Sequence, residues 1–173
     1  VWSGLKHLIP NLLLACGEGS QDPQVRLHMA YAALCSGIGL ANAGLGIVHG
    51  LAGPIGGWFP IPHGVICGTL IASAQRQNWL AIKKRMPNHP SVTRMADVGR
   101  LLPGGSSIHN DMAAVDHLTD TLEDWVHRLN IPRLGCFGLS ADDLDRIVKA
   151  SSNRNNPIEL TSGEIRILVE QRL

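Results

Sequence analysis

Aromatic and basic residues are scarce in this sequence, and neither kind is clustered. Only 4% of the 173 residues are Phe, Trp or Tyr, and 15 Lys and Arg against 14 Asp and Glu leave a formal net charge of +1. The triplet Lys83-Lys84-Arg85 is isolated, which is typical of a solvated helix face. Proteins that bind nucleic acid carry a basic patch, so we expect no nucleic-acid partner.

Acidic residues are missing from a long stretch of the chain, since no Asp or Glu lies between Asp22 and Asp97. His49 and His63 lie inside this stretch. Neutral imidazole is a good ligand for zinc, iron and nickel, and two nitrogens that share one ion lie no more than ~4 Å apart. Two histidines cannot fill a site, so any carboxylate ligand must come from another part of the molecule. The alternative is a pair of buried, hydrogen-bonded histidines.

The sequence also lacks a C-x-x-C pair, and its first residues form neither a signal peptide nor a transit peptide. These absences favour a cytoplasmic protein. The cysteines are widely spaced among apolar neighbours, and we expect them to be buried, reduced thiols: Cys16, Cys35, Cys67 and Cys136.

The chain starts without an initiator methionine. Its first residues have the apolar spacing of an amphipathic helix, with Leu5, Leu8 and Leu12 three or four positions apart. A start inside a helix indicates a piece of a longer gene product, and we therefore expect a fragment.

Charged residues are absent between Arg26 and Arg76. The stretch from Met29 to Val48 is as long as the ~20 residues needed to cross a bilayer. A membrane hairpin formed by residues 29–48 and 64–80 is therefore one alternative. The stretch is rich in Gly and Ala, however, and a central helix buried on all sides has the same composition. We favour the buried helix and expect no membrane partner.

Helix start and stop signals recur along the chain, whereas no segment shows the alternation of a strand. Asp22-Pro23 predicts a helix that runs to about Val48, and the Gly- and Pro-rich residues 53–62 predict irregular backbone after it. Further helices are predicted from Pro62 to before Pro87, over Ser91–Leu102 and 108–129, and after Ser140–Asp143 and Thr161–Glu164. The predicted fold class is all-α, with about seven or eight helices in a single domain over residues 1–173.

The run around the two histidines resembles the iron-containing (group III) alcohol dehydrogenase family. The helical domain of that family carries an Asn-Ala-Gly-Leu-Gly-x-x-His segment, a Gly-Gly turn, and Pro-His-Gly followed by a helix with an asparagine. The matching residues here are Asn42-Ala43-Gly44-Leu45-Gly46 with His49, then Gly56-Gly57, Pro62-His63-Gly64 and Asn78. Residues Asn155-Asn156-Pro157 and Leu160-Thr161 are similar to the family's closing loop, so the resemblance covers essentially the whole chain.

This resemblance implies a dehydroquinate synthase-like helical half and a metal-dependent alcohol dehydrogenase. His49 and His63 match two of the family's four metal ligands, and the other two, an Asp and a His, would lie upstream of Val1. The implied metal is iron, with zinc as the alternative. NAD or NADP would be bound by an N-terminal nucleotide-binding domain absent from this chain. The implied substrate is a small-molecule alcohol or aldehyde, and we expect the fragment alone to be inactive.

The resemblance departs from the family at Gly53, where many members have a second histidine near the nicotinamide and the substrate. The role of that histidine is not carried over to this chain. A helical half without its partner domain is expected to expose an apolar surface along residues 53–64 and to form a homodimer. The remaining alternative is a non-catalytic helical interaction domain whose histidines bind no metal.

Overall fold

The computed structural model describes all 173 residues and contains helices as its only regular elements. This confirms the predicted all-α class. Eight α-helices and two short 3-10 helices follow one another along the chain: α1 Trp2–Ala15, α2 Pro23–Ala43, α3 Ile47–Trp58, α4 His63–Arg85, α5 Ser91–Leu101, α6 Asp111–Arg128, η1 Leu134–Phe137, η2 Ala141–Asp143, α7 Leu144–Ala150 and α8 Ser162–Glu170.

Side-chain caps explain where several of these helices begin. The Asp22 carboxylate accepts a 2.8 Å hydrogen bond from the Gln24 N–H at the start of α2. At α8 the Thr161 hydroxyl and the Glu164 carboxylate cap each other's backbone N–H groups. Such caps satisfy N–H groups that have no partner inside the helix, so a polar residue before an apolar run predicts a helix start correctly here.

The helix predicted from Asp22 to Val48 ends early, at Ala43. Gly44 follows with φ +73°, in the left-handed region that favours glycine. A Cβ at Gly44 would lie 2.4 Å from the Asn155 side chain, so this turn needs glycine for space as well as for conformation.

The irregular backbone predicted over residues 53–62 is wrong in its first half, because α3 continues through Pro54 to Trp58. Proline removes the N–H that would bond to the carbonyl four residues earlier, which belongs to Gly50. That carbonyl instead accepts a 3.4 Å hydrogen bond from the Ser152 N–H. A distant loop thus replaces the lost bond, and the helix persists.

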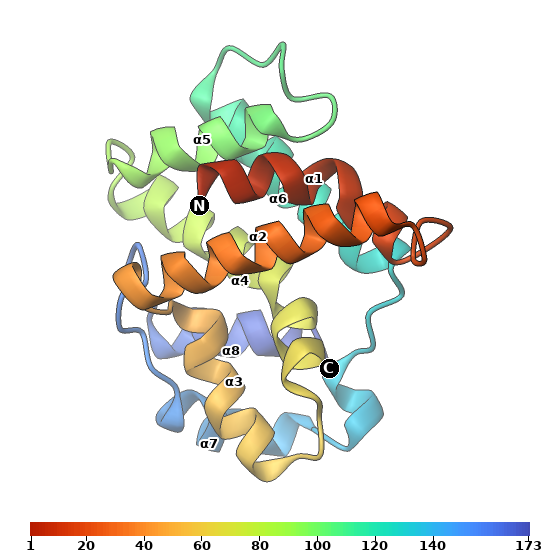
Figure 1. Cartoon of the computed structure of the whole chain (residues 1–173). Helices are drawn as coiled ribbons and strands as arrows, with labels where there is room; N and C mark the ends of the chain where they lie inside the picture. Colours follow the sequence, from red (N-terminus) through yellow and green to blue (C-terminus); the bar gives the residue numbers. More distant parts are fainter.

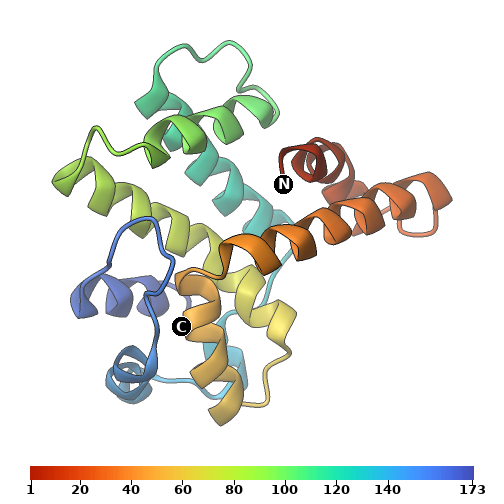
Figure 2. The ribbon, with the colours of Figure 1, turned by 60° about the vertical axis from the view of Figure 1, so that its left-hand side comes forward.

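Helix α4 runs through the middle of the molecule and contacts α3, α6 and α8 (Figure 1). Helix α5 packs on α6, and α7 packs on α3 and α8. Helices α1 and α2 form an antiparallel pair, and the turn that joins them projects from the side of the molecule (Figure 2). The helical domain therefore surrounds α4, with the α1–α2 pair laid against one side.

The expectation that the uncharged stretch Met29–Val48 forms a buried central helix is wrong. Helix α2 buries Val25 and Ala32 alone, and it exposes a row of apolar side chains four or three positions apart: Leu27, Tyr31, Leu34 and Ile38. The buried central helix is α4. No single helix is both long and apolar enough to cross a membrane; α2 and α3 qualify only together, and they meet at 98°.

The cysteines are all free, as expected, but not all are buried. Cys16 and Cys136 are exposed, while Cys35 and Cys67 are half-buried. Apolar neighbours in sequence did not predict burial, because Cys16 ends α1 at the projecting turn and Cys136 lies in the surface 3-10 helix η1. Of the fourteen large exposed apolar side chains, five lie on α2, more than on any other helix, whereas the apolar surface expected along residues 53–64 contains only Trp58.

Candidate metal centre

His49 lies in the first turn of α3, two residues after Ile47 begins the helix. No side chain of α3 caps this start. The Asn156 side chain does so from the C-terminal loop, because its Oδ1 accepts a 3.2 Å hydrogen bond from the Ile47 N–H. The Nδ2 of Asn156 donates to Asn78 Oδ1 at 2.7 Å and to the Ile158 carbonyl at 2.7 Å. Asn78 of α4, which is buried, and Asn156 of the loop, which is half-buried, therefore fix the helix turn that carries His49.

Glycine lets the C-terminal loop approach this turn closely. A Cβ at Gly50 would lie 2.0 Å from the Ser152 carbonyl oxygen, and one at Gly46 would lie 3.1 Å from Asn156 Oδ1. The same loop supplies the Ser152 N–H that bonds to the Gly50 carbonyl. Any larger residue at Gly50 would push the loop and helix apart, and with them the backbone of His49.

His63 is the first residue of α4, and Pro62 occupies the N-cap position with φ −56°. Cys67 follows His63 by one helical turn, so the two side chains project from the same face of α4. His63 is exposed and Cys67 half-buried. Helix α3 packs against α4, which brings His49 to this face from the opposite side.

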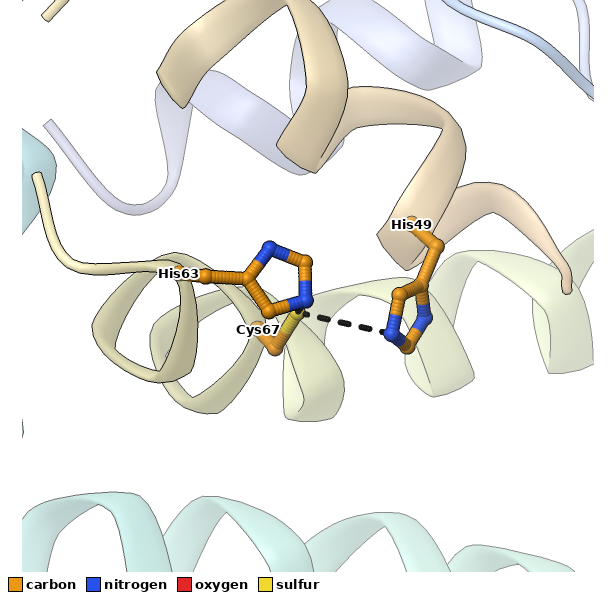
Figure 3. A group of neighbouring side chains, drawn as sticks. All are labelled: His49, His63 and Cys67. Atoms are coloured by element: carbon orange, nitrogen blue, oxygen red, sulfur yellow. Dashed lines mark hydrogen bonds between the residues drawn. The ribbon is translucent and has the colours of Figure 1, made fainter. Parts of the chain in front are cut away.

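The three side chains converge (Figure 3). Cys67 Sγ lies 3.4 Å from His63 Nε2 and 3.9 Å from His49 Nε2. The two imidazole rings are tilted by 48° with centroids 5.3 Å apart, and all three donor atoms lie within 4.8 Å of one another. No other group of three or more His, Cys, Asp or Glu side chains in the chain converges in this way, and this one contains no carboxylate.

The surroundings of His49 and Cys67 favour the neutral form of each side chain while no metal is bound. Burial lowers the pKa of His49 below its ordinary value, and the charge of nearby His63 lowers it further. His49 is therefore a neutral imidazole near pH 7, the form that binds metals. Burial raises the pKa of the Cys67 thiol, so without a metal the thiol keeps its proton and metal binding must displace that proton.

A largely apolar cavity of about 640 Å³ adjoins the cluster, and His49 contributes to its wall. Asn78 and Asn156, the pair that caps α3, also line it. One turn further along α3, a Cβ at Gly53 would meet no atom within 4 Å. The space beside the cluster is therefore open on α3, where a larger side chain could be accommodated.

His49 and His63 lie close together, as their sequence context predicted, whereas no sequence pattern was used to predict Cys67 or Asn156 beside them. The signal for Cys67 was its place four residues after His63 at the start of a predicted helix, which puts both side chains on one face. Its apolar neighbours outweighed that signal. Asn156 carries no comparable signal, because it caps a helix that begins 109 residues earlier in the chain.

An all-helical domain that gathers the donor atoms of two histidines and a cysteine from two neighbouring helices has a candidate metal centre. The family model described as "Fe-containing alcohol dehydrogenase family, C-terminal" matches residues 3–173, and this chain belongs to that family.

Individual relatives are consistent with this assignment. Long-chain-alcohol dehydrogenase 1 of Geobacillus thermodenitrificans is 31% identical over 97% of this chain and 42% of its own length. Alcohol dehydrogenase 4 of Schizosaccharomyces pombe is 29% identical over 96% of this chain and 38% of its own length. A crystal structure of 1,3-propanediol oxidoreductase superposes with a TM-score of 0.85 at 26% identity, over 99% of this chain and 44% of that one. The chain thus spans about two fifths of these proteins.

Proposed function

We propose that these residues form the metal-binding helical part of an alcohol dehydrogenase that transfers hydride between a small-molecule alcohol or aldehyde and NAD(P). His49 and His63 are two of the metal ligands. The observation that supports this proposal is their convergence from two different helices, with donor atoms close enough to reach one ion after a small adjustment. The proteins similar to this chain are alcohol dehydrogenases, which supports the oxidoreductase class.

The ligand set fits a divalent metal of the iron or zinc kind. Imidazole nitrogens suit both metals, and neither histidine is tied up in an ion pair. A bound divalent metal would polarise the alcohol oxygen and so favour the loss of hydride to the nicotinamide ring. The protein's part is to hold His49 in place, which the Asn156 cap and the Ser152–Gly50 contact do, and to keep it neutral, which burial and the nearby His63 do by lowering its pKa.

The other participants are supplied from outside these residues. By the family resemblance, an Asp and a further His of the metal site would come from outside these residues; the cluster itself contains no carboxylate. We further propose that a separate N-terminal domain binds NAD or NADP. Dinucleotide sites are built on parallel sheets, and this chain supplies helices only. A homodimer in the cytoplasm is part of the same proposal.

Metal titration tests the ligand assignment directly. A metal-free protein that carries these residues together with the nucleotide-binding domain, titrated with zinc in a calorimeter, is expected to bind in its unaltered form, and His49→Ala and His63→Ala are expected to weaken binding by more than about tenfold, since each removes a ligand. His127→Ala, which removes an exposed histidine of α6, is the matched control and should leave binding unchanged. Equal affinity in all four proteins would overturn the assignment.

The reaction itself is tested in a protein that carries these residues together with the nucleotide-binding domain. Alcohol-dependent reduction of NAD or NADP, followed by the absorbance of the reduced nicotinamide, is expected in the metal-loaded protein and should be lost in His63→Ala. Metal-independent reduction at the same rate would exclude the proposed chemistry.

A further inference from the structure

Cys67 stands at the metal centre without a role in the proposed function. Its Sγ lies 3.4 Å from His63 Nε2 and 3.9 Å from His49 Nε2 (Figure 3). It is half-buried and forms no disulfide. The thiol therefore faces the point at which the two imidazoles meet.

The spacing of these atoms can be compared with that of a tetrahedral metal site. With zinc–sulfur bonds of ~2.3 Å and zinc–nitrogen bonds of ~2.0–2.1 Å, tetrahedral angles place sulfur about 3.6 Å from each nitrogen. The two observed separations of 3.4 and 3.9 Å lie on either side of that value. The two nitrogens would need to be about 3.4 Å apart in the same geometry, which they can reach from within the observed 4.8 Å limit by side-chain rotation.

We propose that the Cys67 thiolate is a third protein ligand, so that this chain alone supplies a two-histidine, one-cysteine site for a borderline-soft divalent metal such as zinc. The inference rests on the proposed function in one respect, since it uses the same two histidines. Thiolate is a soft ligand that favours zinc over hard cations, and its negative charge compensates the metal where no carboxylate is near. The three donors of this chain leave at least one coordination position for a ligand from outside these residues.

The architecture explains why this third ligand is well placed. His63 and Cys67 lie on consecutive turns of α4, whose interior is anchored by the fully buried Ile66 and Leu70. Their relative position is therefore set by one rigid helix. His49 is fixed separately, by the loop that caps α3. Metal binding needs only side-chain rotation of the three ligands, while both backbones stay in place.

Cobalt provides a spectroscopic test that does not depend on activity. The metal-free, reduced 173-residue chain is titrated with Co(II), whose bond to a thiolate gives an intense charge-transfer band in the near ultraviolet. We expect this band in the unaltered chain and in Cys136→Ala, a control that removes an exposed thiol from η1. We expect Cys67→Ala to lose the band completely and to bind zinc more than about tenfold more weakly in competition with a chromophoric chelator.

The outcomes separate this inference from the function on which it rests. Co(II) bound with visible bands but without the charge-transfer band, and with equal affinity in Cys67→Ala, would overturn the role of Cys67 and leave the two histidines as ligands. Absence of any Co(II) or zinc binding by the unaltered chain would overturn the three-ligand site, but not the proposed function, whose remaining ligands lie outside these residues and which has its own titration. Cys67→Ser keeps the size of the side chain and serves as a second variant. If its far-ultraviolet circular dichroism spectrum equals that of the unaltered chain, a loss of metal binding is not caused by a loss of folding.

Discussion

Helices α2 and α4 are the two longest in the molecule, at 21 and 23 residues, and both begin in the stretch that lacks acidic residues. Their environments are opposite. Helix α4 buries eleven residues and holds two of the three candidate ligands, whereas α2 buries two and turns an apolar face outwards. An apolar composition therefore did not determine which helix became the core.

Long-range polar contacts distinguish the two helices. On α4 the Trp79 indole N–H donates to Asp116 at 2.6 Å, Asn78 bonds to Asn156, and Arg76 pairs with carboxylates of α6. The polar side-chain contacts of α2 reach only its hairpin partner α1, through Ser3 to Tyr31 and His7 to His28. A helix with partners in several other elements is held in the centre, and one with a single partner stays at the edge.

Truncation of one leucine on each helix should give the largest difference between α4 and α2 in the free energy of unfolding. Leu70 in α4 is fully buried, so Leu70→Ala is expected to lower the free energy of unfolding by ~2–5 kcal/mol through lost contacts and a cavity. Leu34 in α2 is 62% exposed, and Leu34→Ala should change it by no more than ~0.5 kcal/mol. Urea unfolding measures both. Similar losses would mean that the outer face of α2 is covered in solution.

Local structure could be predicted from the sequence because its causes are local. The starts of α2 and α8 follow from the adjacent Asp22 and Pro23 and from the Thr161–Glu164 capping box, whose residues are only three positions apart. The end of α2 and the path of α3 through Pro54 were predicted wrongly. Their causes are Asn155 and Ser152, which lie about a hundred positions further along the chain.

The candidate site also contains residues that could be predicted from the sequence and one that could not. His49 and His63 stood out because of the glycine and proline around them, and family resemblance linked them. To predict that Cys67 lies beside His49, the helix start at His63 would have to be combined with the angle at which α3 crosses α4. That angle depends on packing between helices. The sequence of one segment alone does not determine the angle between two helices.

Glycine substitution on each helix gives a smaller, more exact test of the same contrast. A Cβ at Gly37, in the exposed middle of α2, would meet no atom within 4 Å. Gly37→Ala should therefore stabilise the fold by ~0.5–1 kcal/mol, since alanine favours the helix and limits the unfolded chain. In α4 a Cβ at Gly68 would lie 3.3 Å from Ile131 Cδ1, so Gly68→Ala should stabilise the fold less than Gly37→Ala does. Both are measured as shifts of the urea midpoint, and destabilisation by Gly37→Ala would contradict an open α2 face.

The smallest expected difference in stability between the two helices comes from their charged side chains. Arg76 of α4 pairs with Asp120 at 2.7 Å and Glu123 at 2.8 Å on α6, and hydrogen bonds to Glu123 and Asp120 raise its pKa. Arg26 of α2 is exposed and forms no ion pair within 4 Å.

Because the Arg76 carboxylate partners are solvent-exposed, Arg76→Gln is expected to cost no more than ~1 kcal/mol at low salt. Arg26→Gln should have no measurable effect. The two proteins are compared by thermal unfolding at ~0.01 M and ~1 M salt, where the screening length falls from ~30 to ~3 Å. The cost of Arg76→Gln should shrink at high salt if the ion pair is its source. A cost that persists at high salt would instead assign it to the packing of the Arg76 side chain between α4 and α6, and the core position of α4 would then rest on apolar contacts more than on charge.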